Sequence, residues 1–339
     1  MRSRFPLGAT TLFLVLAACA GTDPAGPGAV AGAGNGGATT AGAVGASGSG
    51  GGGTAAGAGS GGASAGAGTG GAGAGGVAGG GASGVGGGAG AAGAAGAGGA
   101  AGAGGSAAYN PCPTNGNDCR IMPLGDSITD GCCGENTKSM GGSYRVELFH
   151  LSLINDKKLT FVGSHSSGPS VVDNVAFPKK QEGHSGWTIA DGGGRDGLQD
   201  QVEAWLKATP PDIITLMIGT NDVGIQLDLP DAPKRLGVLI DTITKTTPNA
   251  LLVVAQIVPT KTDSENTRVQ AFNAGIPAVV KTFVDAGKHV ILVDMYGAYT
   301  KNPNYKTAYM ANDLHPSDAG YAAMANAWWD AIGNLLPNR

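Results

Sequence analysis

Five short apolar runs alternate with longer amphipathic stretches along the C-terminal part of the chain. The runs, which are candidate strands, are residues 120–124, 159–162, 213–218, 251–257 and 290–293. The amphipathic stretches, which are candidate helices, are residues 144–154, 198–208, 232–246, 267–286 and 319–336. Near-continuous Val, Ile and Leu strands separated by helices indicate a parallel sheet that is covered on both faces. The pattern therefore predicts a flavodoxin-like, three-layer α/β/α sandwich with a five-stranded parallel sheet in strand order 2-1-3-4-5.

Residues 1–18 are typical of an export signal. Arg2 and Arg4 precede an apolar run that is too short to span a membrane, and small residues lead up to Cys19. These residues resemble a bacterial lipobox, in which Cys19 becomes the lipidated first residue of the mature protein; an ordinary secretory signal is the alternative. Ala20 resembles the residue that directs lipoproteins to the outer membrane. We therefore expect an exported lipoprotein of the outer membrane or cell surface that touches the membrane through Cys19 only.

Residues 19–108 lack the side chains needed for a hydrophobic core. They are almost entirely Gly, Ala, Ser and Thr, and Asp23 is the one charged residue. Such a segment cannot offset the entropy of ordering its backbone, which predicts a disordered tether with a span of roughly 50 Å. Residues 109–339 are then one domain, long enough to bury a core. The slightly acidic net charge of −4 argues against a nucleic-acid partner.

Apart from Cys19, the chain has four cysteines: Cys112, Cys119, Cys132 and Cys133. An even number in an exported protein predicts two disulfides, for which three connectivities are possible. We favour Cys112–Cys119, which closes a small loop and leaves Cys132–Cys133 as a vicinal pair. The cysteine spacing does not match a zinc site and no histidine cluster accompanies it, so we expect no metal.

Three polar residues occupy loops at the predicted carboxyl edge of the sheet. Ser127 follows the first strand, Asn221 follows the third, and His315 precedes the last helix. Each also has a purely structural interpretation. Ser127 and Asp130 fit a helix-capping pattern, Asn221 fits a turn, and His315 precedes a proline.

Taken together, these residues supply what a serine nucleophile needs. A serine becomes reactive through a base, a partner that orients the base, and donors that face the developing oxyanion. Gly186, on the loop beyond the second strand, adds a backbone N–H where a side chain would crowd a substrate. The sequence therefore predicts a nucleophilic site at this edge of the sheet.

Four blocks of the sequence resemble the SGNH (GDSL) hydrolases. They are Gly-Asp-Ser-Ile-Thr at 125–129, Gly186, Gly-Thr-Asn-Asp at 219–222 and Asp-Leu-His-Pro at 313–316, in the order and spacing of that family. The likeness extends over residues 110–337. Residues 141–145, 183–187 and 320–321 further resemble the branch that contains the acetylxylan esterases of carbohydrate esterase family 3.

The resemblance implies a role for each matching residue. Ser127 would be the nucleophile and His315 its general base and later general acid. The N–H of Ser127, the N–H of Gly186 and the side-chain amide of Asn221 would form the oxyanion hole. The implied chemistry needs no cofactor.

One position departs from the family pattern. The aspartate that orients the histidine usually stands three residues before it, where this chain has Asn312. Either Asp313 takes over this task, or Asn312 orients the imidazole through its carbonyl oxygen, as in Cys-His-Asn proteases. We favour Asn312, because loop geometry normally persists through a change of one side chain.

The resemblance predicts a serine esterase that deacetylates a polysaccharide such as acetylated xylan through an acyl-enzyme on Ser127. Trp187 and His184, which flank Gly186, are the candidate substrate contacts, and packing is the alternative for both. A lipase or thioesterase on the same scaffold is one alternative function. An inactive carbohydrate-binding surface module is another, suggested by Asn312.

Overall fold

The computed structural model of the protein describes residues 109–132 and 141–339. The predicted signal (1–18), tether (19–108) and lipidation of Cys19 lie outside the described residues, so they stay predictions. No helix within the described ranges is long and apolar enough to cross a membrane.

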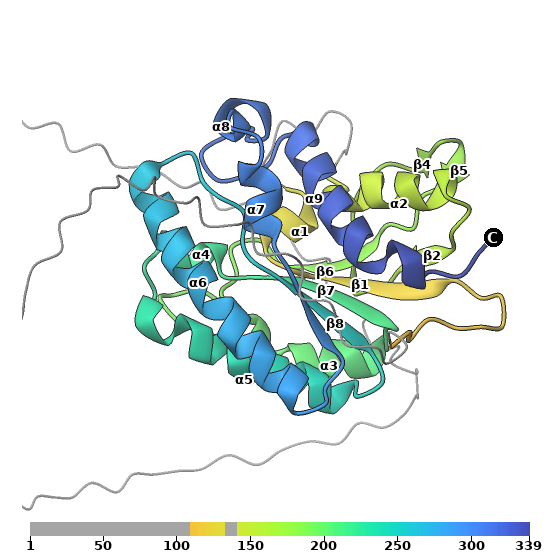
Figure 1. Ribbon diagram of the computed structural model, residues 1–339, viewed down its shortest axis with the longest axis horizontal. Helices are drawn as coiled ribbons and strands as arrows, with labels where there is room; N and C mark the ends of the chain where they lie inside the picture. Colours follow the sequence, from red (N-terminus) through yellow and green to blue (C-terminus); the bar gives the residue numbers. More distant parts are fainter. Residues whose placement is uncertain (1–108, 133–140) are drawn as a thin grey trace, which may run out of the picture. The chain divides into compact units, whose positions relative to one another are not determined.

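A mostly parallel sheet forms the centre of the domain (Figure 1). Its strands within the described residues are β1 (Cys119–Gly125), β2 (Leu159–Phe161), β3 (His165–Ser166), β6 (Lys180–Gly183), β7 (Ile213–Met217), β8 (Leu251–Ala255) and β9 (Val290–Val293). On one side, the first residues of β1 pair with β2 and its last residues pair with β6; β7, β8 and β9 follow on the other side. All residues of β7 and β8 are buried, which explains their uninterrupted apolar sequences.

The five predicted strands are all present and lie in the predicted order, β2-β1-β7-β8-β9. The sheet differs from the five-stranded prediction by two short additions, β3 and β6, which pair with each other antiparallel. The sequence of β6, Lys-Gln-Glu-Gly, has no apolar run that would reveal a strand. Glu182 can be buried there because its carboxylate accepts hydrogen bonds from the N–H and hydroxyl of Ser164 and from the ring of His184.

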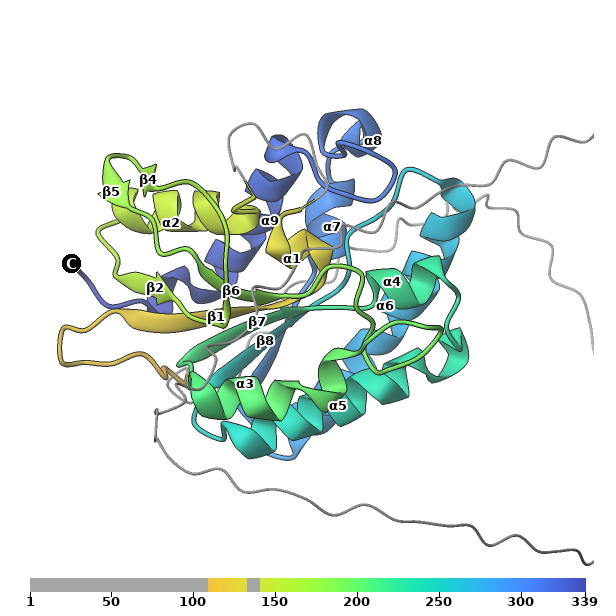
Figure 2. The same cartoon turned by 180° about the vertical axis from the view of Figure 1, so that it is seen from behind.

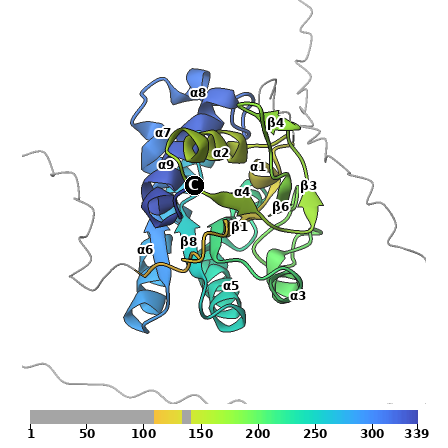
Figure 3. The same cartoon turned by 90° about the vertical axis from the view of Figure 1, so that its right-hand side faces the viewer.

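Helices cover both faces of the sheet (Figure 3). One face carries α2 (Tyr144–Ile154) and α9 (Asp318–Ile332), and the other carries α3 (Val202–Ala208), α5 (Ala232–Thr246) and α6 (Asp263–Asp285). The largest buried side chains of α5 recur at intervals of one, three and four residues and form one apolar stripe: Leu236, Leu239, Ile240 and Ile243. The three-layer α/β/α architecture is confirmed.

The predicted helices differ from the observed ones mainly at their ends. The bounds of α2 and α5 match the predicted 144–154 and 232–246. α6 begins at Asp263 rather than at residue 267, because the acidic Asp263 and Glu265 suit the first turn of a helix but give no apolar signal. The predicted helix 198–208 is a 3-10 turn, η1 (Leu198–Asp200), followed by α3. The end of the predicted 319–336 is likewise a 3-10 turn, η3 (Gly333–Leu335).

Several short elements were not predicted. They are α1 (Ser127–Asp130), α4 (Thr220–Gly224), α7 (Met295–Thr300), α8 (Tyr305–Ala308), η2 (Leu229–Asp231) and the hairpin of β4 (Val171–Val172) and β5 (Val175–Ala176). α1 and α4 directly follow β1 and β7 and lie together at one end of the sheet (Figure 2). This end is where the predicted site residues gather.

A disulfide joins Cys112 to Cys119, as the sequence predicted. It ties the segment that enters the domain to the first residue of β1. The other predicted pair includes Cys133, which lies outside the described residues, so that pairing stays a prediction.

Candidate active site

Three neighbouring parallel strands end side by side at the site. Gly125, the last residue of β1, pairs with Gly183 of β6 on one side and with Met217 of β7 on the other. Two to four residues beyond this row lie the three residues predicted for the oxyanion hole: Ser127, Gly186 and Asn221. The register of the sheet therefore brings three distant segments to one edge, at the switch point where a doubly wound sheet binds its ligand.

A sharp turn from β1 into α1 presents Ser127. Asp126 is the N-cap of α1, and its Oδ1 accepts a hydrogen bond from the N–H of Ile128 at 2.9 Å. The capping pattern in the sequence pointed to Ser127, but the structure gives this task to Asp126. Burial raises the pKa of Asp126 to about 7. The hydroxyl of Ser127 is thus left for another partner.

That partner is His315, on the loop before α9. The Oγ of Ser127 lies 3.0 Å from the Nε2 of His315, and Ser127 is 6% exposed. Burial lowers the pKa of His315, because the interior disfavours the charged imidazolium. The ring is therefore neutral at neutral pH and is able to take up a proton.

Asn312 fixes the tautomer of this ring. Its Oδ1 accepts hydrogen bonds from the N–H of Leu314 at 2.9 Å and of His315 at 2.7 Å, and lies 3.3 Å from the Nδ1 of His315. An atom that accepts from two backbone N–H groups is the amide oxygen, so Nδ1 must carry the proton that it donates to Asn312. Nε2 is then unprotonated and accepts the hydroxyl proton of Ser127.

Asp313 does not take this place. Among the residues that the structure describes, no hydrogen bond joins its carboxylate to His315. Its backbone carbonyl accepts a hydrogen bond from the N–H of Lys261 at 3.0 Å, and the side chain is exposed. Of the two predicted alternatives, the structure therefore places Asn312 against the imidazole.

The predicted oxyanion donors occupy constrained positions. Gly186 has φ of 84°, a left-handed conformation that favours glycine, and its carbonyl accepts a hydrogen bond from the Nη1 of Arg195 at 2.8 Å. The Nδ2 of Asn221, a residue that is 6% exposed, donates to the carbonyl of Trp187 at 2.8 Å. Because an amide NH₂ has two protons, one remains for a substrate. The N–H of Ser127 is in the first turn of α1, where backbone donors have no partner within the helix.

The two candidate substrate contacts differ in their surroundings. His184 is 7% exposed, its Nε2 lies 2.9 Å from Glu182, and its ring stacks on Trp205 at a centroid distance of 4.2 Å. These contacts favour a packing role for His184 over the predicted substrate contact. Trp187 packs against His184 at a centroid distance of 4.5 Å and lies 5.7 Å from Trp205, but it is only partly buried. Trp187 thus remains available to a ligand.

Two residues that hold the site were not singled out from the sequence. Asp222 is fully buried, yet in the sequence it was only the last residue of the Gly-Thr-Asn-Asp block at 219–222. Arg195 follows the glycine-rich stretch 192–194, which gives no sign of a contact with Gly186. The position of Asp222 beside Asn221 was the one available signal.

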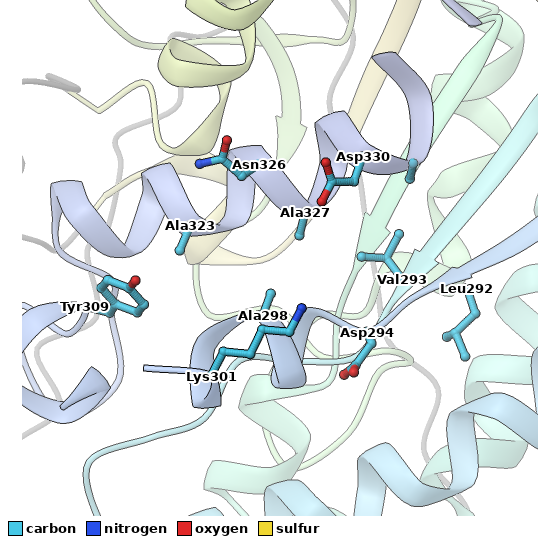
Figure 4. A pocket seen from close by; sticks show the side chains of 11 residues that line it. Leu292, Val293, Asp294, Ala298, Lys301, Tyr309, Ala323, Asn326, Ala327 and Asp330 are labelled. Atoms are coloured by element: carbon cyan, nitrogen blue, oxygen red, sulfur yellow. The ribbon is translucent and has the colours of Figure 1, made fainter. Parts of the chain in front are cut away.

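A separate groove of about 560 Å³ lies between the end of β9, α7 and α9 (Figure 4). Ala298 of α7 and Lys301, which directly follows α7, face Ala323 and Ala327 of α9 across it. None of the predicted site residues lines this groove. Within residues 109–132 and 141–339, no group of three or more His, Cys, Asp or Glu side chains is arranged to hold a metal ion.

A serine hydroxyl paired with an imidazole, which is in turn oriented by an amide oxygen, is the arrangement of a serine hydrolase. The fold and the site together therefore define an α/β serine hydrolase. The chain belongs to the GDSL-like lipase/acylhydrolase family, whose family model matches residues 124–323.

Esterases are among the known proteins to which the chain is similar. The structure of a family 3 carbohydrate esterase from Clostridium thermocellum is 34% identical, with a TM-score of 0.54 over 65% of this chain and 98% of that one. A carbohydrate esterase family 3 structure from Talaromyces cellulolyticus, 23% identical over 64% of this chain and 97% of that one, shares the fold with a TM-score of 0.51. A multidomain esterase from Ruminococcus flavefaciens is 27% identical over 234 residues, or 64% of this chain. The chain spans 29% of the length of this relative and 58% of the length of a putative endoglucanase X from Acetivibrio thermocellus, to which it is 30% identical over 140 residues.

Proposed function

We propose that this protein is a serine esterase that removes acetyl groups from a polysaccharide such as acetylated xylan. The observation that carries the proposal is the 3.0 Å contact between Ser127 Oγ and His315 Nε2, with Asn312 behind the ring. The 34% identity to a family 3 carbohydrate esterase over nearly the whole of that chain supports the substrate class.

The reaction follows from the positions of the two side chains. Ser127 Oγ attacks the acetyl carbonyl carbon while His315 Nε2 takes the hydroxyl proton, which gives a tetrahedral intermediate and an imidazolium. The imidazolium then protonates the departing sugar oxygen, and an acetyl ester remains on Ser127. Water, deprotonated by His315, attacks the carbonyl carbon of this ester; the bond to Ser127 Oγ then breaks, acetate leaves, and the imidazolium returns the proton to Oγ.

The negative oxygen of both intermediates needs donors that are already in place. The N–H groups of Ser127 and Gly186 and the second amide proton of Asn221 supply them. Removing one such donor typically lowers kcat by about 10²- to 10³-fold. Asn312 carries no charge and therefore stabilises the imidazolium less than a carboxylate would.

We further propose that the sugar chain of the substrate contacts Trp187. Trp187 is partly buried and close in sequence to Gly186, and its ring packs against the ring of His184 at a centroid distance of 4.5 Å. A flat ring fixed in this way suits stacking against the apolar face of a sugar. We assign Trp187, and not His184, to substrate contact.

The full chain with acetylated xylan as substrate gives the direct test. Acetate should be released, and p-nitrophenyl acetate should be hydrolysed much faster than a long-chain p-nitrophenyl ester. A preference for the long acyl chain would instead indicate a lipase. No turnover of either ester would indicate an inactive binding module.

We also propose, from residues 1–20 alone, that the protein is a lipoprotein of the outer membrane or cell surface. If Cys19 is lipidated, the protein partitions with membranes, and Cys19→Ser leaves it unprocessed or releases it. A processed wild-type protein that stays in the aqueous fraction would contradict a lipid anchor.

A further inference from the structure

We infer that Asp222 and Arg235 form a positioning pair that fixes the oxyanion loop, residues 186–189, against α4. Within the described residues, neither side chain makes a hydrogen bond or ion pair with Ser127 or His315. Their effect on catalysis, which rests on the proposed function, would pass through the placement of Gly186 and Asn221.

The oxyanion loop is held by polar contacts to two other segments of the described chain. Arg195 donates to the carbonyl of Gly186 at 2.8 Å, as noted above. Asn221 donates to the carbonyl of Trp187 at 2.8 Å, and the N–H of Ile189 donates to the Oδ2 of Asp222 at 3.0 Å. Two successive residues of α4 thus bind the loop at both a carbonyl and an N–H. The position of the loop relative to α4 is set by this pair of contacts.

Asp222 is itself fixed from a third element. Its carboxylate is 0% exposed, and Oδ1 accepts a hydrogen bond from the Nη2 of Arg235 on α5 at 3.0 Å. The same guanidinium donates to the carbonyls of Leu227 and Asp228, at 2.6 Å and 3.1 Å, on the segment that follows α4. A buried carboxylate is retained in one place only when its charge and lone pairs are matched. Arg235 supplies the charge, and its guanidinium N–H groups hold both Asp222, in the middle of α4, and the segment that follows α4.

Catalysis is sensitive to this placement because two donors must reach one oxygen. Gly186 belongs to the loop and Asn221 belongs to α4, so the Ile189–Asp222 contact sets how far apart they stand. Oxyanion donors act at about 2.7–3.1 Å, and a shift of about 1 Å forfeits much of their effect. The Ser127–His315 pair comes from other segments and would keep its geometry. Loss of the positioning pair should therefore weaken binding of the transition state more than binding of the substrate.

The test compares Arg235→Met with a control on the same helix, in the full-length protein. Lys245→Met removes an α5 ion pair of similar length, that with Asp241, which is exposed and distant in sequence from the loop. With p-nitrophenyl acetate, Arg235→Met should lower kcat about tenfold or more and change KM by less than about twofold. Affinity for phenylboronic acid, which forms a tetrahedral adduct with a reactive serine, should fall by a similar factor. Lys245→Met should leave kcat, KM and the affinity for phenylboronic acid unchanged.

Two further variants distinguish positioning from simple stabilisation. Arg235→Lys keeps the charge but not the fork, so it should recover part of kcat, and millimolar guanidinium should partly restore Arg235→Met. If Arg235→Met does not fold, Asp222→Asn replaces it in the test. This change keeps an oxygen for the N–H of Ile189, so kcat should fall by less than the tenfold expected for Arg235→Met. An Arg235→Met protein with a lower unfolding midpoint but unchanged kcat and boronate affinity would overturn the inference. A wild-type protein without esterase activity would instead refute the proposed function.

Discussion

The two halves of the site are built in different ways. The base half is contained in one short loop, where Asn312 accepts hydrogen bonds from backbone groups two and three residues ahead and orients His315. The oxyanion half is held by contacts between residues 33 and 34 positions apart, Ile189 with Asp222 and Trp187 with Asn221. Asn312 is exposed, whereas Asp222 is completely buried.

This difference in construction predicts a difference in sensitivity. A change in the base half alters a local, exposed contact, so it should affect the chemistry and spare the stability of the fold. A change in the oxyanion half disturbs buried contacts between elements, so it should affect both. Variants in both halves test this contrast, from the largest expected change in activation or unfolding free energy to the smallest.

The largest effect is expected at Ser127, which serves both halves through its hydroxyl and its backbone N–H. Ser127→Ala should lower kcat for p-nitrophenyl acetate by about 10⁴-fold or more, because the nucleophile is lost. The unfolding midpoint should stay close to that of the wild type. Ser264→Ala, which changes an exposed serine in the first turn of α6, is the control and should be fully active. Residual activity within tenfold of the wild type would place the nucleophile elsewhere.

Stability should separate the two halves most clearly at Asp222. Asp222→Ala leaves the guanidinium of Arg235 and the N–H of Ile189 without their buried partner, and breaking such a pair costs about 3–5 kcal/mol. Asn312→Ala removes an exposed acceptor and should cost about 1 kcal/mol. Denaturant unfolding of both variants measures the difference. Equal losses of stability would remove the contrast between the halves.

Within the base half, Asn312 and Asp313 should behave differently. Asn312→Ala should lower kcat by about 10²-fold, or about 2.7 kcal/mol, because the imidazole loses the acceptor that fixes its tautomer. Asp313→Ala should stay within about threefold of the wild type. Asn312→Asp should equal or exceed the wild type, since a carboxylate stabilises the imidazolium better. A crippling effect of Asp313→Ala instead would make Asp313 the orienting residue.

The pH dependence should report the burial of His315. Because burial lowers its pKa in the folded enzyme, the acid limb of kcat/KM should have its midpoint below the usual histidine value of about 6.5. Activity is then retained as the pH falls towards this midpoint and is lost below it. In Asn312→Asp a nearby carboxylate favours the imidazolium, so the midpoint should move to higher pH. An unchanged midpoint would show that residue 312 does not act on the ring.

The smallest effect is expected at Trp187, at the outer rim of the oxyanion half. Trp187→Ala should raise KM for acetylated xylan by about 2- to 10-fold, which corresponds to a stacking contribution of about 0.5–1.5 kcal/mol. The kcat/KM for p-nitrophenyl acetate should change much less, because that substrate has no sugar chain. Equal losses on both substrates would mean that the ring only packs against His184.

Much of the frame was predictable because it depends on local pattern. The five apolar strands and the limits of α2 and α5 follow from the burial of continuous or periodic apolar side chains. The order of the blocks around Ser127, Asn221 and His315 also follows from the chain itself. β6 was not predictable in this way, because its buried Glu182 is stabilised by Ser164 and His184 rather than by an apolar neighbour.

The sequence by itself determined the class of fold, the residues proposed to react and the edge of the sheet at which they meet. Tertiary structure alone decided that Asp222 joins the oxyanion loop to α4, whereas the contact between Asn312 and His315, three residues apart, was already favoured from the sequence. The physical reason is the range of the interactions. Apolar periodicity and turn chemistry act over a few neighbouring residues and leave a mark in the sequence. A hydrogen bond between residues 33 positions apart depends on where the whole sheet places them, and it leaves no local pattern.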